Sequence, residues 1–123
     1  MIPNCLTPCY YCGRSATTVD HVIPRAMLET LKDDPVAYRD CLAGRRRMVP
    51  ACKECNCLAG RSVQDDLEER KQFVKGKLRH RYQRYLDIPR WADDEVGSLG
   101  PALRKFVRRG LRIKALTLER LRW

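Results

Sequence analysis

The stretch Met48–Gly60, MVPACKECNCLAG, joins a short apolar run to two cysteines that are separated by two residues. The run Met48–Ala51 is typical of a short strand, and it leads directly into Cys52-Lys-Glu-Cys55. Two intervening residues let one tight turn present both sulfur atoms to a single ion. The stretch therefore predicts a strand that delivers half of a metal site.

A second pair with the same spacing lies near the start of the chain, in Cys9-Tyr-Tyr-Cys12, and Gly13 after it is typical of a tight turn. Residues 13–51 separate the two pairs, which is a wider gap than an ordinary zinc finger has. Two such turns complete a tetrahedral site of four thiolates, so we expect a structural Zn²⁺. The alternative is that one pair is buried as small apolar side chains. The expected zinc ligands are Cys9, Cys12, Cys52 and Cys55.

The chain has seven cysteines, and an odd number argues against a disulfide framework and for metal binding in a reducing compartment. Cys5 and Cys57 lie close to the two pairs and are competing ligands, whereas Cys41 is expected in the core. The opening residues resemble no signal peptide, and no apolar run is long enough to span a membrane. We therefore expect a cytoplasmic protein.

The stretch Thr17–Ile23, TTVDHVI, lies between the two pairs, and its β-branched residues predict a strand that Pro24 terminates. It contains Asp20-His21. Histidine titrates near neutrality, so His21 can take a proton from water, while Asp20 and Asn56 offer oxygen ligands to an ion such as Mg²⁺. Neighbouring strand residues point to opposite faces, so we expect the strand to end or bulge at this pair.

Two of these residues also have structural interpretations. His21 can be a hydrogen-bonded core histidine, and Asn56 can cap the helix that follows it. The remaining histidine, His80, lies among basic residues and is assigned no catalytic role.

The order Cys-x2-Cys, Asp-His-x-x-Pro and Val-Pro-x-Cys-x-x-Cys-Asn resembles that of the HNH endonucleases, of the phage or mobile-element type, over about residues 5–61. The resemblance implies an α+β protein whose core is a ββα-metal (treble-clef) fold closed by zinc. It also implies DNA hydrolysis with His21 as general base and with Asp20 and Asn56 holding catalytic Mg²⁺ or Mn²⁺. Asn56 replaces the family's last histidine, a variant that the family tolerates.

The family's middle asparagine lies just before the Val-Pro strand, where this chain has Arg47. This difference favours a second interpretation, in which the same zinc scaffold binds nucleic acid or serves in an assembly without catalysis. A third interpretation, an RNA-associated zinc protein, explains the charge and the cysteines but not Asp20-His21 or Asn56.

The expected helices differ in how their ends are marked. Asp34-Pro35 predicts the start of a short helix that ends at Gly44. Ser62, three residues before Asp65, predicts the cap of a helix of about six turns that ends at 87–89. Two shorter helices are expected at about 101–109, with Gly110 as C-cap, and at about 111–121.

The net charge is +10 and the sequence pI is ≈ 9.6, and most of the excess lies in the second half of the chain. Such an excess favours a polyanionic partner, nucleic acid first and an anionic membrane surface a distant second. The family resemblance implies DNA, with RNA as the alternative and no membrane partner. We expect residues 1–61 to form the zinc-stabilised module and residues 62–123 a basic helical extension packed on it as one unit. A protein partner, such as a phage packaging complex, and the oligomeric state remain open. The expected nucleic-acid contacts are Arg45, Arg46, Arg47, Lys71, Lys75 and Arg79.

Overall fold

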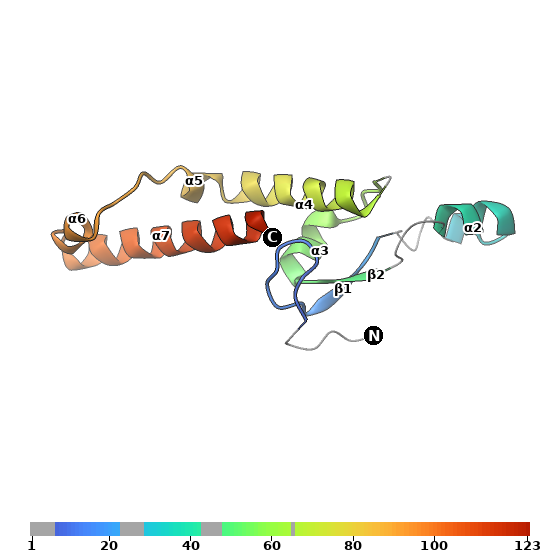
Figure 1. Ribbon diagram of the computed structural model, residues 1–123, viewed down its shortest axis with the longest axis horizontal. Coiled ribbons are helices and arrows are strands. Elements are labelled where there is room, and N and C mark those ends of the chain that lie inside the picture. Colours follow the sequence, from blue (N-terminus) through green and yellow to red (C-terminus); the bar gives the residue numbers. More distant parts are fainter. Residues whose placement is uncertain (1–6, 23–28, 43–47, 65) are drawn as a thin grey trace.

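The computed structural model describes residues 7–22, 29–42, 48–64 and 66–123. It has the predicted α+β class, with one two-stranded sheet and mostly helices (Figure 1). The elements are β1 (Thr18–His21), α2 (Pro35–Leu42), β2 (Met48–Ala51), α3 (Lys53–Ala59), α4 (Leu67–Arg81), α5 (Gln83–Leu86), α6 (Asp93–Gly97) and α7 (Pro101–Arg122).

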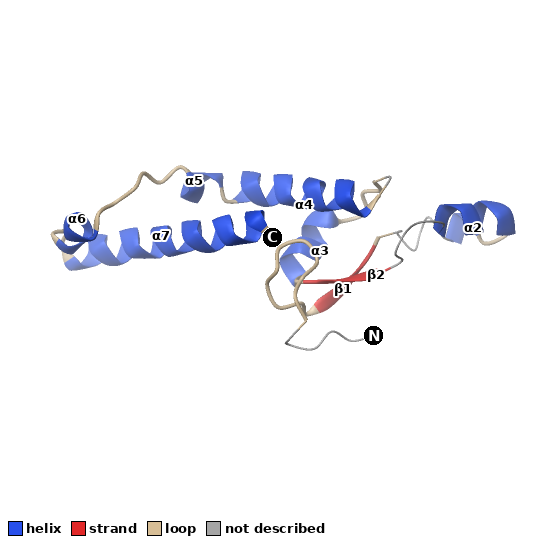
Figure 2. Ribbon diagram, in the orientation of Figure 1, coloured by secondary structure: helices blue, strands red, loops and turns tan. Residues whose placement is uncertain are grey.

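The sheet pairs the two predicted strands antiparallel, with Thr18 opposite Ala51 and His21 opposite Met48. The strand β2 has the predicted bounds, and β1 ends at His21, as the Asp-His pair required. Figure 2 shows the sheet on one side of α3, with α4 on the other side of that helix. The sheet therefore presents one face to the helices.

The first cysteine pair sits on the predicted tight turn. The Gly13 amide donates to the Cys9 carbonyl at 2.9 Å, and Gly13 has a φ of +76°, which favours glycine. The Tyr10 amide donates to the Pro50 carbonyl of β2 at 2.9 Å. This bond places the turn beside the strand that leads into the second pair.

The second pair begins α3. Cys52 is its N-cap, and the Cys52 sulfur accepts a bond from the Cys55 amide at 3.4 Å. The helix ends at Gly60, whose φ is +55°. Because Cys52 caps the helix, one local structure both starts α3 and brings Cys52 and Cys55 together.

The helix α2 starts as predicted, because the Asp34 carboxylate accepts a bond from the Ala37 amide at 3.1 Å. Its predicted end, Gly44, lies outside the described residues. In Figure 1, α2 projects away from the sheet and from the other helices.

The long helix predicted from Ser62 differs from the structure at both ends. It begins at Leu67, because Asp66 accepts a bond from the Glu69 amide at 2.8 Å, whereas the Ser62 hydroxyl donates to the Ala59 carbonyl at 2.6 Å. It also breaks at Tyr82 into α4 and α5, where the Tyr82 hydroxyl donates to Glu54 of α3 at 2.5 Å.

The two short helices predicted after residue 100 are wrong, because α7 is one continuous helix of 22 residues. Gly110 is buried within it and is not a C-cap. A Cβ atom at Gly110 would lie 2.9 Å from Cδ1 of Ile88, so glycine lets the chain after α5 approach α7 closely. The helix lies alongside α4 and α5 and returns the C-terminus to α3 (Figure 1).

One buried cluster draws on both halves of the sequence. It joins the cysteine turns and Tyr11 to Val49 of β2 and to Val74 and Leu78 of α4. Burial of apolar area in such a cluster is the main favourable term in folding. None of the described helices combines the length and apolar character needed to cross a bilayer.

Candidate metal centre and active site

The four predicted cysteines meet in one buried group between the first turn and the start of α3. The sulfur atoms of Cys9, Cys12, Cys52 and Cys55 all lie within 4.8 Å of one another. Cys57 is exposed and outside the group, while Cys5 and the side chain of Cys41 lie outside the described part of the chain. The group can hold a metal ion such as zinc.

The chemistry of these donors fits a cation. Hydrogen bonds among the sulfur atoms raise the pKa of Cys9 and Cys55 and lower the pKa of Cys52. At Cys12 the bond to Cys52 raises the pKa, but the bonds to Cys55 and Cys9 lower it overall. Four thiols buried this close together become thiolate ligands when a Zn²⁺ balances their charge.

An arginine of α7 lies against this group, and sequence reasoning missed it. Nη2 of Arg120 is 3.7 Å from the sulfur of Cys55 and 3.9 Å from that of Cys52, and Nη1 is 2.6 Å from Glu54. Burial alone would lower the pKa of Arg120, but hydrogen bonding to Cys12 and the charge of Glu54 raise it overall. In the sequence, Arg120 is one of several cations on a basic helix, so no signal marked it.

Glu54 links this arginine to the rest of the fold. Its carboxylate also accepts the Tyr82 hydroxyl at 2.5 Å and lies 3.4 Å from Nε of Arg81. Burial would raise the pKa of Glu54, but the bonds from Tyr82 and Arg120 lower it below its usual value. Helices α3, α4 and α7 are therefore joined beside the cysteines by one charged network.

Asp20 is almost fully buried and is paired with Arg70 of α4. Nε of Arg70 donates to Oδ2 at 2.8 Å and Nη2 donates to Oδ1 at 2.9 Å. The Tyr11 hydroxyl also donates to Oδ2, and burial followed by this bond raises the pKa of Tyr11. Burial alone would lower the pKa of Arg70, but Asp20 raises it overall.

This pairing bears on the divalent ion expected at Asp20. Both carboxylate oxygens already accept bonds from a cation of the chain itself. With Arg70 in place, the residues do not fit a divalent ion at Asp20, because the ion needs the same oxygens and the same buried space. The role of Asp20 as an ion ligand stays a prediction, and it requires Arg70 to move.

Asn56 lies inside α3 and holds that helix against β1. Its Nδ2 donates to the Thr18 hydroxyl at 3.1 Å and to the Val19 carbonyl at 3.2 Å. Cys52 is the N-cap, so the interpretation of Asn56 as the cap is wrong. Its amide oxygen accepts no hydrogen bond from the described part of the chain, so this oxygen is free to coordinate a metal ion.

His21 is the last residue of β1 and is partly exposed, so it is not a buried core histidine. Asp20 faces the core, and the alternation of a strand directs His21 to the opposite face. Asn56 binds the hydroxyl of Thr18, which lies on the same face of β1 as Asp20. His21 and Asn56 are therefore connected through β1, but they do not meet on one face of that strand.

No protein-family model, no curated protein and no solved structure matches this chain.

The basic residues predicted to contact nucleic acid fall into three groups. Arg45, Arg46 and Arg47 lie outside the described residues. Lys71 donates to the Trp123 carbonyl at 3.1 Å and lies over the Tyr10 ring, so it also caps the end of α7. Lys75 and Arg79 follow Lys71 at helical spacing, and partial burial and then the charge of Lys71 lower the pKa of Lys75.

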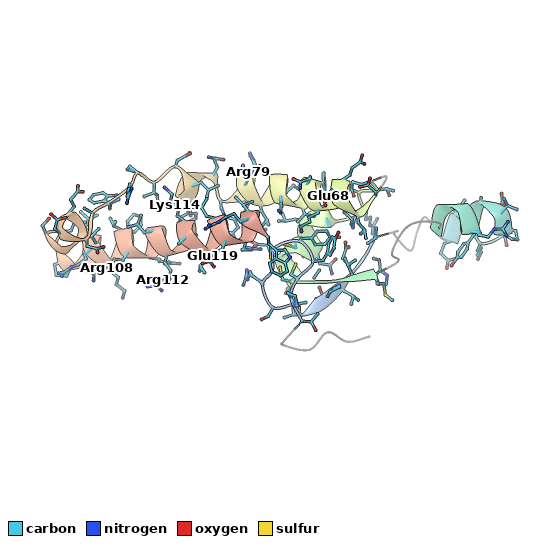
Figure 3. The ribbon with its side chains drawn as sticks, viewed as in Figure 1. Glu68, Arg79, Arg108, Arg112, Lys114 and Glu119 are labelled. Carbon is cyan, nitrogen blue, oxygen red and sulfur yellow. The ribbon has the colours of Figure 1, made fainter. Side chains whose placement is uncertain are left out.

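Exposed positive charge also lies on α7, whereas the individual contacts predicted in the helical half were all on α4. In Figure 3, Arg108 and Arg112 extend from α7 on the side away from α4, while Arg79 extends from α4 on the opposite side. Lys105 and Arg109 of α7 are also exposed. The helical half therefore presents positive charge on more than one side.

Proposed function

We propose that this protein is a zinc-stabilised endonuclease of the HNH type, with a treble-clef core, that hydrolyses phosphodiester bonds in DNA. The observation that carries the proposal is the placement of a partly exposed His21 at the end of β1, with Asn56 bonded to that strand from α3. The buried cysteine group lies at the start of α3, and its first turn is bonded to β2.

In the proposed reaction, His21 accepts a proton from the water that attacks phosphorus, and the bond to the leaving oxygen breaks. A positioned general base of this kind contributes about 10²–10⁴-fold to the rate. A bound Mg²⁺ or Mn²⁺ would supply positive charge at the phosphoryl oxygens, and Asn56 offers it an amide oxygen. Because Arg70 closes Asp20, we assign no step to an ion at that carboxylate.

The zinc has a structural role in this proposal, since a site with four protein ligands leaves no open position for a substrate. Positive side chains of α4 and α7 bind the phosphate backbone. Such contacts position nucleic acid without reading its sequence, which is consistent with a nuclease that acts on DNA of varied sequence.

The test is nicking of supercoiled plasmid by the zinc-loaded protein with added Mg²⁺ or Mn²⁺. The chain has two histidines, so His80→Ala is a matched control for His21→Ala. His80 is exposed on α4, and its loss should leave the rate unchanged. His21→Ala should lower the rate about 10²–10⁴-fold with unchanged zinc content. Equal rates for the two variants would remove His21 from the mechanism.

A second function, nucleic-acid binding without cleavage, is favoured by one observation: Arg70 already neutralises Asp20. A binding module should shift DNA in a gel equally well with and without added Mg²⁺ at constant zinc, and it should never nick plasmid. Cleavage that depends on His21 would exclude this function as the sole activity.

A further inference from the structure

Arg70 uses its whole guanidinium group in the interior of the protein. Two nitrogens bind Asp20, Nε is also 3.1 Å from the Tyr11 hydroxyl, and Nη1 donates to the Ser62 carbonyl at 2.6 Å and to Gln64 at 3.0 Å. The Arg70 side chain is 0% exposed and that of Asp20 is 3% exposed. Partners from three separate segments thus hold the positive charge in one orientation.

The Arg70 guanidinium occupies the position at Asp20 that a metal cation would take. A carboxylate binds a fork of two N–H groups with both oxygens, which are also the oxygens that a divalent ion would use. Both side chains are almost fully buried, so water cannot solvate one charge when its partner is removed. An ion can reach Asp20 only by displacing the guanidinium.

We infer that Arg70 is an internal counter-ion that closes Asp20 to divalent cations and thereby sets the ion affinity of the proposed nuclease site. The inference deepens the proposed function and rests on its ion site. If the Arg70–Asp20 pair only stabilised the fold, removing the charge of Arg70 would change Mn²⁺ binding no more than removing an exposed positive charge elsewhere.

The experiment measures Mn²⁺ binding to the zinc-loaded full chain from the electron paramagnetic resonance signal of free Mn²⁺. Arg70→Gln keeps hydrogen-bond donors and removes the charge, while Arg79→Gln makes the same change in net charge at an exposed position of α4. Arg70→Gln should bind Mn²⁺ at least about tenfold more tightly than the wild type, because it frees a carboxylate ligand. Arg79→Gln should stay within about twofold.

A third variant locates the ion. The double variant Arg70→Gln with Asp20→Asn should return to the affinity of the wild type, because the freed carboxylate is absent. Circular dichroism and zinc content show whether each variant folds. If Arg70→Gln does not fold, Arg70→Met replaces it, since methionine keeps an apolar stem and removes the charge, and tighter Mn²⁺ binding is again expected.

Equal Mn²⁺ affinity for the wild type and the folded Arg70 variant overturns the inference, as does tightening that survives Asp20→Asn. Plasmid nicking separates this result from the proposed function. Tighter Mn²⁺ binding without nicking by any variant supports the counter-ion and removes the nuclease. Nicking that depends on His21, with unchanged Mn²⁺ affinity in Arg70→Gln, removes the counter-ion alone.

Discussion

Replacing Arg120 with methionine should weaken zinc binding from outside the coordination sphere. Arg120 is 7% exposed, its Nη2 approaches two cysteine sulfurs, and its Nη1 is 2.6 Å from Glu54. A zinc ion with four thiolates carries a net negative charge, which a buried guanidinium offsets. Methionine keeps the apolar stem and removes that charge.

The expected loss of zinc affinity is about 10–100-fold, because this is the usual effect of removing a residue that hydrogen-bonds to a metal ligand. This change corresponds to about 1.4–2.8 kcal/mol. Zinc binding is part of the folding free energy, so the free energy of unfolding at fixed free zinc should fall by a similar amount. Competition with a coloured zinc chelator measures the affinity, and guanidinium chloride titration measures the stability.

Arg122→Met is the matched control, because Arg122 is exposed and its Nε makes only a 3.4 Å bond to the Leu118 carbonyl. It should change the stability by less than about 0.5 kcal/mol. Arg120→Lys should fall between the two, since it keeps the charge and loses the second N–H group. If Arg120→Met and Arg122→Met bind zinc equally, the reasoning about the outer contacts is refuted.

Three further substitutions test the fold, each by guanidinium titration at fixed zinc. Gly76→Ala should stabilise by about 0.5–1 kcal/mol, because alanine favours a helix and, apart from the adjoining residues and backbone of α4, no described atom lies within 4 Å of the new Cβ. A loss of stability would contradict this. Gly13→Ala should destabilise by about 1–3 kcal/mol, because its φ is +76° and the Cβ would lie 2.7 Å from the Trp123 ring; wild-type stability would show that the turn adapts. Tyr82→Phe should destabilise by about 1–2 kcal/mol through loss of its bond to Glu54, and no change would remove that bond from the network.

The sequence predicted the parts of the fold that local chemistry decides. The cysteine spacing predicted the buried group, and the run Met48–Ala51 predicted β2 with its observed bounds. These features depend on a few neighbouring residues. Asp34-Pro35 likewise marked the start of α2.

The errors occurred where a contact between distant segments decides the structure. The break at Tyr82 coincides with its bond to Glu54, and Gly110 lies inside α7 because the segment at Ile88 packs against it. Arg70 and Arg120 were missed for the same reason, since a buried arginine and a solvated one look alike in a basic helix. The Asp20-His21 motif indicated a chemical group, but only the fold shows which cation faces Asp20.

These two arginines change how the charge asymmetry of the chain is understood. The basic second half supplies Arg70 to Asp20 and Arg120 to Glu54 and the cysteines, so part of its excess charge neutralises acidic centres of the first half. It also supplies Val74 to the shared core.

A chain of residues 1–61 alone would keep the four cysteines of the buried group and lose these two arginines. We expect it to bind zinc without cooperative unfolding, and we expect an added 62–123 peptide to restore a cooperative transition in circular dichroism. Breaking a buried ion pair by removing one partner costs about 3–5 kcal/mol, which is comparable to the whole stability of a small domain. A 1–61 fragment that unfolds cooperatively with zinc would show that the first half is an independent domain, on which the basic half is only an attachment.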